Sequence, residues 1–500
     1  MALADRTFDL LVVGGGIHGV AAAWDAAQRG LAVALVERDD FGSGVSWNSL
    51  KIIHGGLRYL QTGDLVRLRE SVHERAALLR IAPGLVKPLG FLLPTRGHGL
   101  KGREAMAVGL LLNDLLSADR NRGLPSDRRI PRSRVLSSRE AQALVPGLAA
   151  EGLNGGALWY DAQVESSERL TIGFAHAAAS SGAVLANHLE AVGFLRDGSR
   201  VCGARARDQA TGREIEVRAR LTLNAAGPGA LTLLSQAGLS APPVAFLRAM
   251  NLVFARPAGV GLGVGALSGG RYLFLVPWRG LTLVGTAYEP AEVEERSDSV
   301  PVFLEEARRA FPWADLRPAD LCLVHRGLVP GRGSAAGLRG RTLWLDHEAD
   351  GDVRGLLSVI GVKYTTARGV AEAAVDLAAR RLGRSVGPCR TAHTPLPRAR
   401  PLAGTLEEQV REVVREEMAS SLSDALLRRL DIGTTGPPSE GVVERTAEVM
   451  AAELGWDPPR LAAELGSLGD LPESSRIGSS AGHEAPSWVR SDPRPRNCSA

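Results

Sequence analysis

The sequence is poor in cysteine, in aromatic residues and in long apolar runs. The shortage of cysteine and the lack of long apolar runs each exclude a class of protein. The four cysteines lie far apart, with no pair at metal-ligand spacing, so we expect no disulfide framework, no metal site and a reducing compartment. Aromatic residues make up only 5% of the chain. No run reaches the ~18–20 uninterrupted apolar residues of a membrane-spanning helix. The net charge of +4 includes no block of like charge, which argues against a nucleic-acid partner.

Lysine is also scarce, because only four of the 59 basic residues are lysine and the other 55 are arginine. The four are Lys51, Lys87, Lys101 and Lys363. Lysine and arginine differ in geometry and hydration, so a lysine kept in an arginine-rich chain is a candidate for a site that needs a compact ammonium. We single out Lys51 and Lys363, since the other two belong to no recognisable pattern.

What is present fits a large α/β enzyme. The 500 residues are enough for about three domains on a prior of ~150 residues each. The 45% apolar and 23% charged content is that of a globular protein, and 58 glycines suit tight turns and close backbone approach to a ligand. Met1–Asp9 lacks the basic and apolar regions of a secretory leader, so we expect a cytoplasmic location.

The N-terminal segment has every part of a dinucleotide-binding unit. Phe8–Val13 predicts a buried strand, Val20–Arg29 a helix and Leu31–Val36 a second strand that ends at Glu37. The turn between the first strand and the helix contains Gly14, Gly15, Gly16 and Gly19. These glycines permit a tight turn, approach to a pyrophosphate and close helix packing, while Glu37 can accept hydrogen bonds from a ribose.

The next segment carries a longer signature. Ser46–Leu60 reads SWNSLKIIHGGLRYL and resembles the S-x-x-S-x-K-[LI]-[IV]-H-G-G-x-R-Y-L segment of FAD-dependent glycerol-3-phosphate dehydrogenases, within the D-amino-acid-oxidase-like flavoproteins. The resemblance continues along the chain. Asn224–Gly229 is similar to the N-A-[AT]-G-P-W turn of that family, with Gly229 in place of tryptophan, and Leu356–Thr366 is similar to its G-G-K-x-T-T segment, with Val362 in place of the second glycine.

The resemblance implies an α/β fold with three parts: a Rossmann-like FAD-binding domain, a mixed-sheet substrate domain and a C-terminal α-helical domain. The expected boundaries are 1–95, 150–240 and 321–387 for the FAD-binding domain, 96–149 and 241–320 for the substrate or cap domain, and 401–468 for the helical domain. Helical spacing of Leu406, Val410, Val413 and Val414 supports the last part independently. Residues 469–500 are rich in Ser, Gly, Pro and Arg and predict a disordered tail.

The resemblance also implies a set of site residues. Arg58 and Lys363 are the expected catalytic residues, Arg58 as a clamp on a phosphate and Lys363 as a group that stabilises reduced flavin or helps to deprotonate the substrate hydroxyl. The expected substrate-binding residues are Arg58, Tyr59, Asn251, Arg339 and Lys363. The expected FAD-binding residues are Gly14, Gly15, Gly16, Gly19, Glu37, Ser46, Ser49, Lys51, His54, Gly55, Gly227, Gly361 and Thr365.

Two departures from the family pattern affect the substrate. Val329 stands where the family has a second phosphate-binding arginine, and Arg326, Arg332 or Arg339 could replace that residue. Asn251 stands where the family has a histidine that is a candidate base, and an amide can hydrogen-bond a hydroxyl but cannot act as a general base.

The function implied by the resemblance is FAD-dependent oxidation of sn-glycerol 3-phosphate to dihydroxyacetone phosphate, with quinone as electron acceptor. Two alternatives stay open: an oxidoreductase of the same fold that acts on a non-phosphorylated alcohol, hydroxy acid or amine, and a flavin-binding protein with impaired catalysis. The apolar segment Ala105–Leu116 fits either peripheral contact with the cytoplasmic face of a membrane or a buried core helix.

Overall fold

A computed structural model describes residues 3–99, 102–291, 299–332, 335–338, 340–351 and 353–469. The chain falls into two units, one that ends at Leu402 and a smaller one that begins at Ala403. This division lies within two residues of the expected start of the helical domain. Residues 470–500 of the expected tail lie outside the described residues, as does Arg339.

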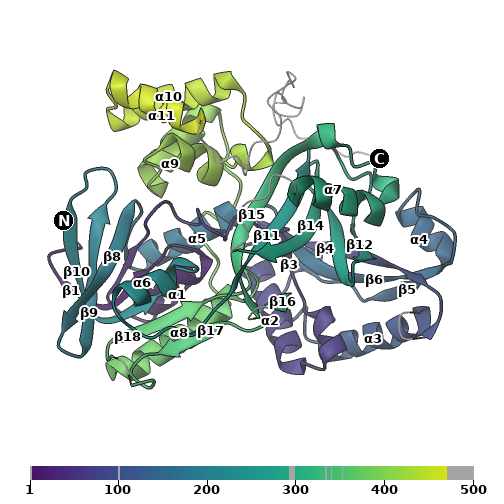
Figure 1. Cartoon of the computed structure of the whole chain (residues 1–500), viewed down its shortest axis with the longest axis horizontal. Coiled ribbons are helices and arrows are strands. Elements are labelled where there is room, and N and C mark those ends of the chain that lie inside the picture. Colours follow the sequence, from purple (N-terminus) through teal and green to yellow (C-terminus); the bar gives the residue numbers. More distant parts are fainter. Residues whose placement is uncertain are drawn as a thin grey trace. The chain divides into compact units, whose positions relative to one another are not determined.

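The first sheet of the larger unit is built around parallel strands (Figure 1). Its neighbours in order are β17 (Leu343–Asp346), β18 (Leu356–Ile360), β10 (Glu214–Asn224), β1 (Thr7–Val13), β2 (Val33–Val36) and β7 (Val184–Ala186), and β9 (Arg200–Asp208) and β8 (Leu189–Asp197) extend it from β10. In the core strand β1, Phe8 and the run 10–13 are apolar and buried because the sheet is covered on both faces. One cover consists of α1 (Ile17–Gln28), α5 (Ser167–Ser180) and α8 (Ala367–Leu382).

The second sheet of this unit is mixed and mostly antiparallel. Its strands in order are β16 (Ala335–Leu338), β15 (Leu321–Arg332), β11 (Phe246–Phe254), β14 (Leu281–Pro290), β13 (Arg271–Trp278), β12 (Gly263–Ser268), β4 (Val86–Arg96), β6 (Leu153–Val164) and β3 (Ile52–Ile53), with β5 (Arg134–Leu136) beside β6. Helix α7 (Ser299–Ala310) contributes Phe303 and Leu304 to a core on one face. The other face carries a second apolar core, which includes Phe91, Trp159 and Val276.

Sheet membership differs from the expected domain boundaries. β4, β6 and β15 fall within the ranges expected for the FAD-binding domain, but all three pair within the second sheet. The chain therefore passes between the two sheets within single expected ranges, as well as between one range and the next. Residues 326–330 of β15 and the end of β18, which belong to different sheets, line the wall of one cavity.

Peripheral helices complete the larger unit. They are α2 (Leu65–Ile81), α3 (Arg103–Leu116), α4 (Ser138–Leu144) and α6 (Gly229–Gln236). The smaller unit consists of α9 (Leu406–Glu417), η6 (Asp424–Arg429), α10 (Glu440–Leu454) and α11 (Pro458–Gly469), with Val410, Val413 and Met450 buried. Among the described residues, no helix is both long enough and apolar enough to cross a membrane.

Candidate active site

A cavity of about 850 Å³ opens at the carboxyl ends of the parallel strands. Its wall combines the glycine-rich turn after β1, the end of β2, the Ser43–Ser46 loop, the turn after β10, part of β15 and the segment after β18. This is where an open α/β sheet binds nucleotides. Of the expected FAD-binding residues, the wall includes Gly14, Gly16, Glu37, Ser46, Gly227 and Gly361.

The glycine-rich turn leaves no room for side chains. A Cβ on Gly14 would lie 2.7 Å from the carbonyl oxygen of Ala225, and a Cβ on Gly19 would lie 1.9 Å from the carbonyl oxygen of Gly14. The Ile17 N–H donates to Ser46 Oγ at 3.0 Å, which ties the first turn of α1 to the following loop. The remaining donors of this helix terminus face the cavity and suit a phosphate.

Glu37 is fixed by backbone hydrogen bonds. The N–H groups of Gly15 and Asp39 donate to its two carboxylate oxygens at 2.5 and 2.9 Å. Burial raises the pKa of Glu37, while these two bonds lower it. Beyond Glu37, the loop after β2 is held by the Asn187 amide, which donates to Asp40 Oδ1 at 3.0 Å.

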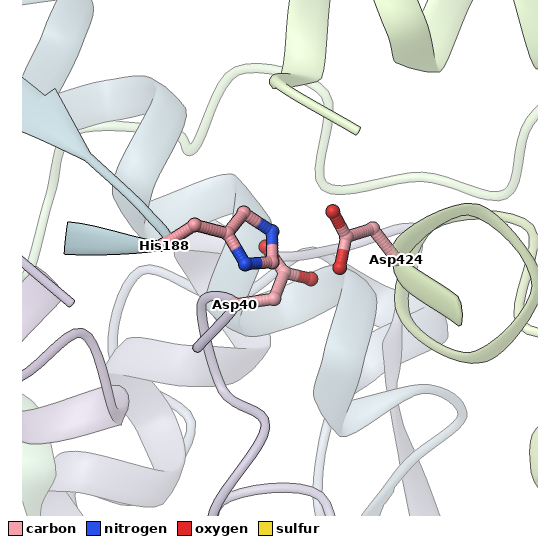
Figure 2. A group of neighbouring side chains, drawn as sticks. All are labelled: Asp40, His188 and Asp424. Carbon is pink, nitrogen blue, oxygen red and sulfur yellow. The ribbon is translucent and has the colours of Figure 1, made fainter. Parts of the chain in front are cut away.

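Figure 2 shows the Asp40 and His188 side chains of this loop region together. The His188 N–H donates to the carbonyl oxygen of Asp39 at 2.7 Å, and His188 adopts a positive φ of 54°. Asp424, also drawn in Figure 2, belongs to the smaller unit, where its Oδ2 accepts N–H bonds from Ser420 and Ser421 at 3.0 Å. The hydrogen bonds of Asp40 and His188 therefore tie the loop after β2 to the segment that follows β7.

Two polar atoms of the cavity wall fit a bound cofactor. His18 Nε2 and Asn48 Oδ1 are buried without a hydrogen-bond partner among the described residues. Burial lowers the pKa of His18 to about 4, so its ring is neutral at physiological pH. Its ring packs against Gly361, where a Cβ would lie 2.0 Å from His18 Cε1. The shape and the donor set of the wall therefore fit FAD.

Five other expected FAD-binding residues do not line the cavity and are tied to one another or to the surrounding protein by hydrogen bonds. Lys51 is fully buried, and its ammonium donates to Glu168 Oε1 and Ser167 Oγ at 2.8 Å. Ser49 Oγ accepts the Lys51 N–H at 3.2 Å. The Gly55 N–H donates to Asp161 Oδ1 at 2.5 Å. Thr365 Oγ1 accepts the N–H of His54 at 3.1 Å, which joins two segments that are far apart in the sequence.

The expected catalytic residues gather around one aromatic ring. Lys363 Nζ lies 4.3 Å from the centre of the Tyr59 ring, and Arg58 Cζ lies 5.2 Å from it. Arg58 also donates to Tyr59 Oη at 3.2 Å. In the part of the chain that the structure describes, neither cation has a carboxylate partner. Burial, followed by the charge of Arg58, lowers the pKa of Lys363 to about 7, and burial also lowers the pKa of Arg58.

His54 stands beside this pair. Its Nδ1 lies 3.9 Å from Asp161 Oδ2, and Asp161 also accepts a bond from Arg75 at 2.6 Å. Desolvation of the His54 ring, helped by the positive charges of Arg58 and Lys363, lowers the pKa of this residue to about 4. The negative charge of Asp161 acts in the opposite direction. The sequence pattern had not identified Asp161 as part of the site, because its role depends on contacts across three segments.

Of the two departures from the family pattern, Val329 lies at the cavity and Asn251 lies inside the second sheet, on β11. Val329 lines the cavity wall, as does Arg326. The side chain of Arg332 lies outside the described residues. Asn251 is buried, and its Oδ1 accepts a bond from Thr286 Oγ1 at 2.8 Å. Asn251 is thus a fixed hydrogen-bonding group rather than a base.

Comparison with known proteins identifies the family. A model described as FAD dependent oxidoreductase matches residues 9–377, and one described as C-terminal domain of alpha-glycerophosphate oxidase matches residues 389–461. A glycerol-3-phosphate dehydrogenase of Synechocystis sp. is 33% identical over 429 residues, which cover 81% of this chain and 76% of that protein. The mitochondrial glycerol-3-phosphate dehydrogenase of Homo sapiens is 34% identical over 406 residues. That match covers 77% of this chain but only 54% of the human protein.

A solved structure gives the same result for the fold. The glycerol-3-phosphate dehydrogenase of Bacillus halodurans complexed with FAD superposes with a TM-score of 0.72 at 22% identity, covering 97% of this chain and 98% of that chain. The expected α/β architecture with a C-terminal helical domain is confirmed. The chain belongs to the FAD-dependent glycerol-3-phosphate dehydrogenase family of FAD-dependent oxidoreductases, and it is an enzyme with FAD as its cofactor.

Proposed function

We propose that the enzyme oxidises sn-glycerol 3-phosphate to dihydroxyacetone phosphate and passes the electrons to a quinone. The observation that carries the proposal is the pair of cations around Tyr59. Arg58 and Lys363 have no carboxylate partner among the described residues, and Lys363 lines the cavity that suits FAD. A phosphorylated alcohol supplies the anionic group that such a pair requires.

The residues divide the chemistry between them. Bound FAD supplies the acceptor for two electrons, transferred as a hydride from the carbinol carbon. Arg58 binds the phosphate, and its planar guanidinium orients the phosphate through paired hydrogen bonds. Lys363 Nζ, whose pKa is lowered to about 7, has a substantial neutral fraction at neutral pH and accepts the hydroxyl proton. The remaining expected contacts, through Tyr59 and Asn251, position the polyol.

Replacing Arg58 with alanine should raise the KM for glycerol 3-phosphate. Loss of a hydrogen-bonded charge contact of about 2 kcal/mol corresponds to roughly 30-fold in KM. The flavin content should stay unchanged, because Arg58 does not line the FAD cavity. Steady-state kinetics with a dye acceptor measure the effect. Arg279→Ala, in the β13–β14 turn, is the control, and equal KM values for Arg58→Ala and wild type would contradict the assignment.

We propose that α3 contacts the membrane that holds the quinone. Only Leu110 of this helix is buried, whereas Val108, Leu111, Leu112 and Leu115 are exposed. Beside them, a groove of about 870 Å³ is lined by Arg129, Arg132 and Arg134. Exposed apolar residues next to arginines favour peripheral binding to anionic lipid. The structure therefore favours surface contact over the buried core helix that the sequence also allowed.

Flotation with liposomes tests this contact. Wild-type protein should float with anionic vesicles, and the double variant Leu111→Glu/Leu115→Glu should remain at the bottom of the gradient, since two buried leucines are worth about 3–6 kcal/mol. Val302→Glu, at an equally exposed position on α7, should float like wild type. Turnover with a soluble quinone should be the same in all three proteins. Absence of wild-type flotation would refute the membrane contact.

A second candidate function follows from Val329. An apolar side chain stands in the cavity wall where the family pattern has a second phosphate-binding arginine. A non-phosphorylated alcohol, hydroxy acid or amine needs fewer cations than a phosphate ester does. Reduction of the flavin by such compounds, but not by glycerol 3-phosphate, would select this candidate. A flavin that none of them reduces would indicate impaired catalysis.

A further inference from the structure

Lys51 is a buried lysine that the chemistry proposed above does not use. Its side chain is fully buried and does not line the FAD cavity. Three groups accept hydrogen bonds from its ammonium: the carbonyl oxygen of Trp47 at 3.0 Å, Ser167 Oγ at 2.8 Å and the Glu168 carboxylate at 2.8 Å. The centre of the Trp278 ring lies 5.0 Å from Nζ. The ammonium therefore has one acceptor for each of its three N–H bonds, all inside the protein.

Trp47 belongs to the loop of residues 43–49, which forms one side of the cavity. Residues 43–46 and Asn48 line the cavity, whereas Trp47 does not. The loop contains neither helix nor strand, so its shape depends on the individual hydrogen bonds that hold it. One of them lies within the loop, where the indole N–H of Trp47 donates to the carbonyl oxygen of Ser43 at 2.9 Å.

The loop is also attached to two helices. Ser46 Oγ accepts the N–H of Ile17 at 3.0 Å, which ties a cavity-lining residue of the loop to the first turn of α1. Lys51 ties the Trp47 carbonyl to the first turn of α5. Both helices contribute to the core on one face of the parallel sheet. The two attachments therefore fix the loop relative to the glycine-rich turn.

The surroundings of Lys51 suit an ammonium and not a guanidinium. An ammonium is a compact charge with three rotatable donors, whereas a guanidinium is planar and presents five donors in a fixed fork. Because Lys51 is fully buried, a longer arginine side chain could not extend into water, and its additional donors would be left without acceptors. This requirement accounts for a lysine at this position in a chain that has 55 arginines.

We propose that Lys51 is a positioning residue for FAD: its ammonium holds the Trp47 carbonyl to α5 and thereby keeps the 43–49 loop in the arrangement that binds the cofactor. Lys51 acts through the loop and does not contact the cofactor itself. One group that it positions is Asn48, whose Oδ1 is buried without a hydrogen-bond partner among the described residues. The proposal concerns FAD binding alone and does not depend on the identity of the substrate.

The double variant Lys51→Met/Glu168→Met tests the proposal without leaving an unpaired buried charge. Apolar side chains of similar volume can replace a buried ion pair with little loss of stability, so the flavin-free variant should melt close to the wild-type temperature. The dissociation constant of FAD, measured by flavin fluorescence, should rise about tenfold or more, because the loop loses a hydrogen bond to a charged group. Hydrogen exchange in residues 43–49 of the flavin-free variant should become faster, while exchange in α8 stays unchanged.

Two further variants complete the experiment. Asp25→Leu/Arg29→Met removes another buried ion pair, on α1, whose residues do not line the cavity. This matched control should leave the dissociation constant of FAD and the exchange of residues 43–49 unchanged. Lys51→Arg keeps the positive charge but not the compact ammonium, so it should weaken FAD binding as the double variant does.

The outcomes that contradict the proposal are distinct. If Lys51→Met/Glu168→Met binds FAD as tightly as wild type, Lys51 does not position the cofactor. If FAD binding weakens only together with the melting temperature, and exchange in residues 43–49 stays at the wild-type rate, the role of Lys51 is general stability and the proposal fails. An equal loss of FAD binding in the α1 control would also refute it. Wild-type FAD affinity in Lys51→Arg would refute the requirement for an ammonium.

Discussion

Replacing Lys363 with alanine is expected to slow flavin reduction by glycerol 3-phosphate at least ~10²-fold, the usual contribution of a positioned proton acceptor. The reason is local. Lys363 Nζ lies over the Tyr59 ring with no carboxylate partner among the described residues, and its pKa is lowered to about 7 by burial and then by Arg58. A substantial neutral fraction is therefore available to accept the hydroxyl proton. Anaerobic stopped-flow measurement of flavin bleaching gives the rate directly.

The pH dependence adds a second signature. Below its pKa, Lys363 carries a proton and cannot accept another, so kcat/KM for flavin reduction should fall as pH decreases through about 7. This acidic limb should be absent in Lys363→Ala. Lys87→Ala, which removes an exposed lysine paired with Glu165, is the matched control. An unchanged reduction rate, or an acidic limb that persists in Lys363→Ala, would count against Lys363 as the proton acceptor.

Replacing Gly19 with alanine is expected to abolish FAD binding. The new Cβ would lie 1.9 Å from the carbonyl oxygen of Gly14, so α1 and the glycine-rich turn must move apart. This movement displaces the helix terminus that faces the pyrophosphate. We expect the purified variant to retain less than about a tenth of the wild-type flavin, as measured by the ratio of flavin to protein absorbance.

A glycine in the middle of another helix provides the control. Gly109 lies inside α3, and a Cβ there would meet nothing within 4 Å. Gly109→Ala should bind FAD normally, since alanine is favoured in a helix by about 1 kcal/mol. Normal flavin content in Gly19→Ala would show that the turn tolerates a side chain and would remove the close-packing argument.

The FAD-binding unit could be predicted from the sequence because its determinants are local. One stretch of about thirty residues contains the strand, the glycine-rich turn, the helix and Glu37, and their spacing specifies how they pack. The sheet membership of β4, β6 and β15 could not be predicted in this way. A strand has the same pattern in either sheet, and its partner is chosen by contacts that are distant in the sequence.

The sequence names candidate site residues one by one, but it does not show how they are arranged in space. Arg58, Tyr59 and Lys363 come from two motifs about 300 residues apart, and only the fold shows that both cations lie beside the Tyr59 ring. Lys51 matched a cofactor-binding motif, yet its ammonium pairs with Glu168 inside the protein.

The most direct test of the account is anaerobic addition of glycerol 3-phosphate to the purified, FAD-loaded wild-type enzyme. We predict rapid bleaching of the flavin absorbance at millimolar substrate, which would mean that Arg58 and its neighbours suffice for phosphate recognition without an arginine at position 329. A flavin that stays oxidised with glycerol 3-phosphate, but is bleached by dithionite, would contradict the proposed substrate.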